Sequence, residues 1–128
     1  MKTATTALQM LIRGCGVILI VLGILFWTGS AIGLVPVHML LGLVLVLALW
    51  GLAILAVMNG VGVGLVVVGV VWGLIVLILG LTQTGLLTGP AHWVIQVLHL
   101  LVGVVAIGIA ESLGRQIKRR LTLQPQNV

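Results

Sequence analysis

The sequence predicts an all-α protein, a four-helix transmembrane bundle with up-down-up-down topology. Hydrophobic residues make up 62% of the chain, and the mean hydropathy is +1.44. Charged residues make up only 5%, whereas soluble domains contain about 25%. Short polar breaks divide the chain into four apolar runs, each long enough to cross a bilayer core of ~20 residues. This composition excludes a soluble enzyme and a disordered chain.

The breaks give the expected bounds of the helices. They lie at Thr28-Gly29-Ser30, at Asn59-Gly60 and at the polar stretch 82–90. The connections are too short for a further domain, so consecutive helices are expected to be antiparallel. We expect one bundle over residues 1–112 and a basic amphipathic cytoplasmic tail over 113–128. The four helices are expected at about 8–30, 32–58, 61–82 and 91–112.

Charge is confined to the two ends of the chain. The net charge of +5 would suit nucleic acid, but the cations flank apolar runs, and this is the positive-inside pattern instead. With an even number of helices, both termini are expected to be cytoplasmic in a multi-pass protein of the cell membrane. Trp27 and Trp93 then fall near the outer boundary. The apolar run resumes at Ala31, which favours a first membrane helix over a cleavable signal peptide.

The expected tail has an apolar stripe. Leu113, Ile117 and Leu121 recur every four residues, with basic residues between them. Such a segment can lie along the anionic inner leaflet with its basic side chains near lipid headgroups. The alternative is a simple topology anchor.

Small residues predict close helix packing. The chain has 18 glycines, and the third run carries two pairs with a spacing of four: Gly60 with Gly64, and Gly69 with Gly73. These favour close packing within the chain or between copies in a homo-oligomer. The lone Cys15 cannot form an intramolecular disulfide and is expected to be a packing residue.

The histidines are the candidate functional residues, because an ionisable side chain inside a membrane span is costly. His38 and His99 each begin a His-x-x-x-Gly motif that ends at Gly42 or Gly103. The two motifs lie on helices two and four, which run in the same direction. A glycine one turn from a histidine leaves a notch for a flat ligand on the same helix face. Imidazole suits iron, so the pattern fits haem b held between two histidines near the outer side.

The partner of His38 depends on how depth is counted. Counted from the start of each apolar run, His99 matches His38, whereas counted from the helix-starting prolines His92 is the better match. We favour His99, which repeats the motif and lies deeper. His92 would then bond a haem propionate, and Gln96 would support His99. In the alternative, His38 and His92 are interfacial residues and His99 hydrogen-bonds a backbone carbonyl.

The paired motifs resemble those of small four-helix b-type membrane cytochromes, such as the cytochrome b561 type, and half of a heme A synthase bundle. The resemblance covers the four-span topology and the motifs around 38–42 and 96–103, and it implies that His38 and His99 are axial ligands. Two departures limit it. Three histidines allow only one bis-histidine haem per chain, and no glutamate stands beside a ligand, as a haem-oxidising synthase would need.

Function follows from this ligand set. Two axial imidazoles leave iron no open position, so we expect an electron carrier and not an enzyme, with a quinol or another redox partner as donor or acceptor. A protein that stores, transfers or senses haem would have the same ligand set and is the alternative. One rival is a small multidrug-type transporter, but no mid-membrane carboxylate is present to couple protons to transport. The other rival is a cofactor-free membrane scaffold.

Overall fold

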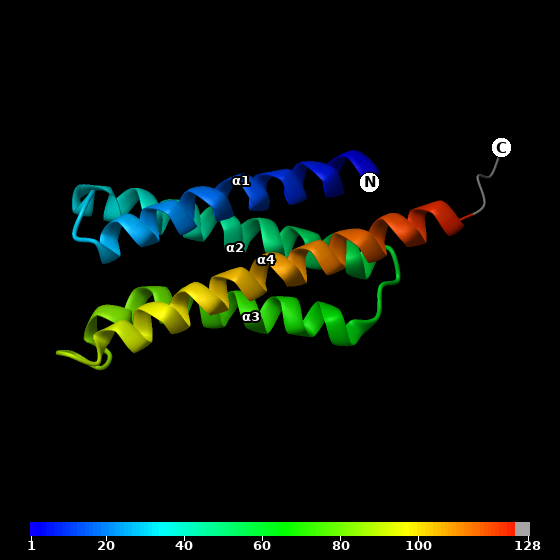
Figure 1. Cartoon of the computed structure of the whole chain (residues 1–128). Helices are drawn as coiled ribbons and strands as arrows, with labels where there is room; N and C mark the ends of the chain where they lie inside the picture. The colour runs from blue at the N-terminus through cyan, green and yellow to red at the C-terminus, as the bar shows by residue number, and fades with distance from the viewer. Residues whose placement is uncertain (125–128) are drawn as a thin grey trace.

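The computed structural model describes residues 1–124 and is helical throughout, apart from turns and short connections (Figure 1). All four long helices are long and apolar enough to cross a membrane, so the predicted four-helix transmembrane fold is confirmed. They are α1 (Lys2–Trp27), α2 (Val35–Met58), α3 (Val63–Thr82) and α4 (His92–Leu123). Two short 3₁₀ helices, Ile32–Leu34 and Gln83–Gly85, lie in the connections.

The four helices form two antiparallel hairpins, α1–α2 and α3–α4, which pack against each other. Helices α2 and α4 touch across the bundle, whereas α1 and α3 make no contact in the described chain. The start of α1 and the end of α4 lie at one end of the bundle, here called the termini end (Figure 1). The α1–α2 and α3–α4 connections lie at the opposite end, the hairpin end.

Glycines in the left-handed conformation end the first two helices. At the end of α2, Gly60 has φ +68° and donates to the Val57 carbonyl, while Val61 donates to the Ala56 carbonyl. This pair of bonds is the Schellman motif, which satisfies carbonyls that would otherwise have no partner. Gly29 ends α1 in the same way. Gly60 therefore belongs to the turn, and our assignment of the Gly60–Gly64 pair to helix three was wrong.

The core is concentrated toward the termini end. Between Leu45 and Ala56, helix α2 buries seven residues, whereas between Val35 and Val44 it buries none. On α1, only Leu22 is buried beyond Gly16. The hairpin end, which holds the histidines, is therefore less densely packed by aliphatic side chains than the termini end.

Helix α1 begins earlier than expected, at Lys2 instead of residue 8. Its first turns are held because Thr5 and Gln9 are buried, at 0% and 3% exposure. Gln9 packs on α4 beside Gly114, where an added Cβ would overlap the Gln9 amide. The early part of α1 is thus stabilised by the late part of α4, a contact that no local pattern in α1 indicates.

The predicted amphipathic tail continues α4 as one helix to Leu123; residues 125–128 of that prediction lie outside the described residues. Leu113 and Ile117 are both 0% exposed inside the bundle, and Leu121 is half-buried. The apolar stripe is thus covered by protein. It does not rest on the lipid surface as one of our interpretations had it.

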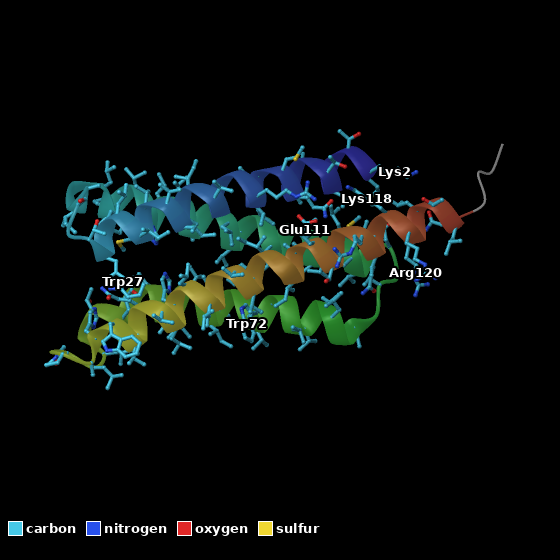
Figure 2. The ribbon with its side chains drawn as sticks, viewed as in Figure 1. Lys2, Trp27, Trp72, Glu111, Lys118 and Arg120 are labelled. Carbon is cyan, nitrogen blue, oxygen red and sulfur yellow. The ribbon has the colours of Figure 1, made fainter. Side chains whose placement is uncertain are left out.

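A single acidic side chain links α1 to α4 at the termini end (Figure 2). Glu111 accepts hydrogen bonds from Arg13 Nε at 2.7 Å and from a terminal Arg13 nitrogen at 2.8 Å, and a third from Gln9 Nε2 at 3.1 Å. The bidentate geometry fixes both position and orientation of the two side chains. The sequence contains one acidic residue, and Arg13 pairs with it. The remaining lysines and arginines therefore have no carboxylate side chain to pair with.

The second glycine pair packs within the chain. A Cβ at Gly69 would lie 3.1 Å from Leu113 of α4, and one at Gly73 would overlap the Trp50 indole of α2. The Trp50 indole donates to the Val70 carbonyl at 3.2 Å, so it has little freedom to move aside. The Trp72 indole of α3 likewise donates to the Val102 carbonyl of α4 at 2.9 Å. Gly69 and Gly73 thus let α3 approach both of its neighbours.

We expect Gly73→Ala to lower the free energy of unfolding by about 1–2 kcal/mol, because the added methyl group meets the Trp50 indole. The control is Gly108→Ala on α4, where an added Cβ meets no atom within 4 Å. Alanine there is expected to be neutral or slightly stabilising. Melting temperatures in the same detergent compare the two variants. Equal melting temperatures would contradict the packing described for Gly73.

Candidate functional site: the His38–His99 pair

The site lies near the hairpin end, between the two helices that touch across the bundle. His38 stands three residues after the start of α2, and His99 stands seven residues after the start of α4. Both side chains are half-buried. Because α4 begins about one turn farther out than α2, residues at different distances from their helix starts reach the same level.

The two imidazole rings lie close to each other. Their centroids are 6.2 Å apart, with an angle of 48° between the ring planes. A metal–nitrogen bond to histidine is about 2 Å, and the ring centroid lies ~1 Å farther along the same line. Two imidazoles on opposite sides of one metal ion therefore have centroids roughly 6 Å apart. The observed separation matches this value.

Each ring has a buried nitrogen without a partner. The Nδ1 atoms of both His38 and His99 are buried and form no hydrogen bond. A buried polar atom left unsatisfied costs about 1–3 kcal/mol, so such atoms in native proteins call for a ligand or another explanation. One alternative from the sequence was that His99 hydrogen-bonds a backbone carbonyl. His99 Nδ1 makes no such bond in the structure, so this nitrogen does not support that alternative.

Each histidine packs against a glycine of the preceding helix in its own hairpin. A Cβ at Gly23 of α1 would lie 4.0 Å from His38 Cε1, and a Cβ at Gly80 of α3 would lie 3.4 Å from His99 Cε1. Phe26, one turn after Gly23, meets the His38 ring edge-on with centroids 5.4 Å apart. The two hairpins therefore present their histidines in equivalent surroundings.

The glycines of the His-x-x-x-Gly motifs leave open space beside the rings. Gly42 and Gly103 are half-buried, and an added Cβ at either position would meet no atom within 4 Å. Each lies one turn from its histidine on the same face of the helix. Each motif therefore has a half-buried notch at its glycine, next to the histidine in the helix.

The other predicted residues lie near the pair but do not join it. His92 is the first residue of α4, and its Nδ1 lies 3.1 Å from the Leu86 carbonyl oxygen in the preceding connection. Gln96 is half-buried one turn before His99. Of the two pairings considered from the sequence, the structure brings together His38 and His99.

Sequence reasoning missed three residues of this site: Gly23, Gly80 and Phe26. Both glycines lie on the helices that precede the histidine-bearing ones. Their sequence distances to the histidines differ, 15 residues for Gly23–His38 and 19 for Gly80–His99, which hides the equivalence of the hairpins. The two glycines could have been found by aligning the sequences of the two hairpins on their histidines and allowing a gap of one helical turn.

The protein donor set is limited to two residues. Among residues 1–124, no group of three or more His, Cys, Asp or Glu side chains is placed to bind a metal ion. A four-coordinate zinc site or a three-ligand copper site would need further protein ligands. Haem needs only two, because its porphyrin supplies four nitrogens to the iron.

An apolar groove lies on the surface formed by α3 and α4, and two of its lining residues are close to His99 in the sequence. Leu98 and Val102, on either side of His99 in the sequence, both line it. The remaining lining is aliphatic apart from Thr82, whose hydroxyl is already bonded to the Ile78 carbonyl. The groove therefore suits an apolar molecule.

Comparisons with protein-family models, with curated proteins and with solved structures find no match for this chain.

Proposed function

We propose that the chain is a membrane haem b protein that transfers electrons, with one haem per chain and His38 and His99 as the axial ligands. The observation that supports this is the pair of imidazoles from α2 and α4, whose centroids are 6.2 Å apart. This separation suits one iron between them. The glycine notches and the unpartnered Nδ1 atoms support the same proposal.

The residues of the site hold and shield the cofactor. His38 and His99 supply the two axial nitrogens, and Gly42 and Gly103 leave room for a flat ring system beside them. The rotation of the His38 ring is limited by Gly23 and Phe26, and that of the His99 ring by Gly80. Haem supplies one-electron oxidation and reduction when bound. The surrounding apolar side chains exclude water and lower the local dielectric constant, which affects the reduction potential.

Ligation on both faces favours electron transfer over catalysis. An iron with two protein ligands has no open position for oxygen or for a substrate. The protein is therefore a carrier in this proposal, and its partners exchange electrons with it at the edge of the ring. The apolar groove formed by α3 and α4 is suited to a lipid-soluble donor such as a quinol.

His92 is positioned to bind a haem carboxylate at the hairpin end. His92 Nδ1 lies within hydrogen-bond distance of the Leu86 carbonyl oxygen. The tautomer that donates this bond carries its hydrogen on Nδ1, so its Nε2 can only accept. Both nitrogens donate only when the ring is protonated. In that protonated form Nε2 binds a propionate. With the termini cytoplasmic, as the positive-inside rule requires, this end faces outward in the cell membrane.

The first test is the absorption spectrum of the detergent-purified protein, oxidised and then reduced with dithionite. We expect a Soret band that shifts on reduction, sharp visible bands, and one haem per chain. Carbon monoxide added to the reduced protein is expected to leave the spectrum unchanged, because both axial positions are filled. A protein that stays colourless when haemin is added would contradict the proposal.

A further inference from the structure

The last three turns of α4 carry an excess of positive charge that the chain does not neutralise. Arg115, Lys118, Arg119 and Arg120 follow one another within two turns of α4. Figure 2 shows Lys118 and Arg120 at the termini end. The sequence has a single acidic side chain, Glu111, and that carboxylate already pairs with Arg13. The cations of α4 therefore need anions from outside the chain, or water.

Two of these arginines line a shallow groove on the outer face of α4. The groove is formed by Gln116, Arg119, Arg120 and Leu123. Their spacing of three and four residues brings these side chains together on the surface of the helix, and all four are exposed. The groove thus combines two guanidinium groups and an amide with an exposed apolar side chain.

The other two cations of α4 are arranged differently. A terminal nitrogen of Arg115 donates to Ser112 Oγ at 3.2 Å, and Lys118 is half-buried. Neither lines the groove. The site is therefore made by particular arginines and not by the basic segment as a whole.

The length of α4 places this groove at the level of lipid headgroups. From His92 to Arg119 the helix rises ~40 Å, at 1.5 Å per residue. A bilayer has a hydrocarbon core of about 30 Å, and about 40–45 Å with its headgroups. With His92 at one interface, Arg119 and Arg120 reach the opposite headgroup layer.

We infer that this groove binds the headgroup of an anionic phospholipid. Arg119 and Arg120 bind the phosphate oxygens, since guanidinium groups bind phosphate in a bidentate manner. Gln116 donates a further hydrogen bond, and Leu123 contacts the start of an acyl chain. This inference is independent of haem, because none of the residues that bind the lipid lies near the hairpin end.

The test measures lipid binding to the full-length protein by native mass spectrometry, with phosphatidylglycerol or phosphatidylcholine added in mild detergent. We expect phosphatidylglycerol to bind at least tenfold more tightly than phosphatidylcholine. The double variant Arg119→Gln/Arg120→Gln is expected to lose that preference. The matched control, Arg115→Gln/Lys118→Gln, removes the same number of charges from the same helix and is expected to change the affinity by less than threefold.

Two outcomes would overturn the inference. Equal losses in both double variants would mean that the attraction is diffuse and that no discrete site exists. Displacement of the lipid by inorganic phosphate or glycerol 3-phosphate at similar concentrations would mean that the site takes a soluble phosphate. An unchanged melting temperature of each variant shows that any loss of binding is not loss of folding.

Discussion

Replacing His38 or His99 by alanine is expected to remove the low-spin haem spectrum, with haem content falling at least tenfold in each variant. The two rings have centroids 6.2 Å apart, and in the proposed coordination each supplies one of the two protein ligands of the iron. Loss of one imidazole leaves the iron with a single protein ligand, which also changes its spin state. Haem per chain and the reduced-minus-oxidised spectrum measure both effects.

His92→Ala is the matched control for these variants. It removes a histidine from the same helix as His99, but His92 bonds the Leu86 carbonyl and belongs to neither ring pair. We expect the spectrum to keep its shape and the haem content to stay above half of the wild-type value. Loss of the spectrum in His92→Ala with retention in His99→Ala would show that our pairing is wrong.

A glycine variant of His99 separates ligand loss from misfolding. In His99→Gly the missing side chain leaves space, and free imidazole added to the purified variant is expected to restore the low-spin bands. Restoration requires a folded bundle, so it shows that the histidine acts as a ligand. A folded His99→Gly variant that keeps haem without imidazole would contradict that role.

Gly114→Leu is expected to lower the free energy of unfolding by about 3 kcal/mol or more. A Cβ at this position already overlaps the Gln9 side chain, and Gln9 is 3% exposed with no space to move into. Overpacking of a core costs about 1–3 kcal/mol. Displacing Gln9 also breaks its 3.1 Å bond to Glu111 and leaves a buried amide unsatisfied, which costs about 1–3 kcal/mol more.

Gly108→Leu provides the comparison for this effect. Gly108 is on the same helix but is exposed, and an added Cβ there meets no atom within 4 Å. Denaturation of both variants in the same detergent micelles gives the difference directly. A Gly114→Leu protein as stable as the Gly108→Leu protein would refute the close approach of α1 and α4.

Much of the fold could be predicted from the sequence because membrane helices have a strong compositional signal. Polar breaks and the glycines at 29 and 60 mark the ends of α1 and α2, and the apolar runs between breaks match the bilayer thickness. The ends of the helices outside the apolar runs were less predictable. Lys2–Ala7 and Leu113–Leu123 are mixed in polarity, so hydropathy does not mark them as parts of membrane helices, although both are helical in the structure.

The candidate site could be predicted only in part. The spacing of His38 with Gly42 and of His99 with Gly103 drew attention to both histidines. Their relative depth could not be derived, because it depends on α4 starting about one turn farther out than α2. The contributions of Gly23 and Gly80 are tertiary contacts between helices, and no periodicity within one helix reports them.

Low-temperature electron paramagnetic resonance of the oxidised protein tests the central claim most directly, because the signal reports the axial ligands of ferric haem. Two imidazoles from His38 and His99 predict a low-spin ferric signal that integrates to one iron per chain. A high-spin signal from haem-loaded protein, or a low-spin signal that survives in both alanine variants, would contradict the proposed coordination.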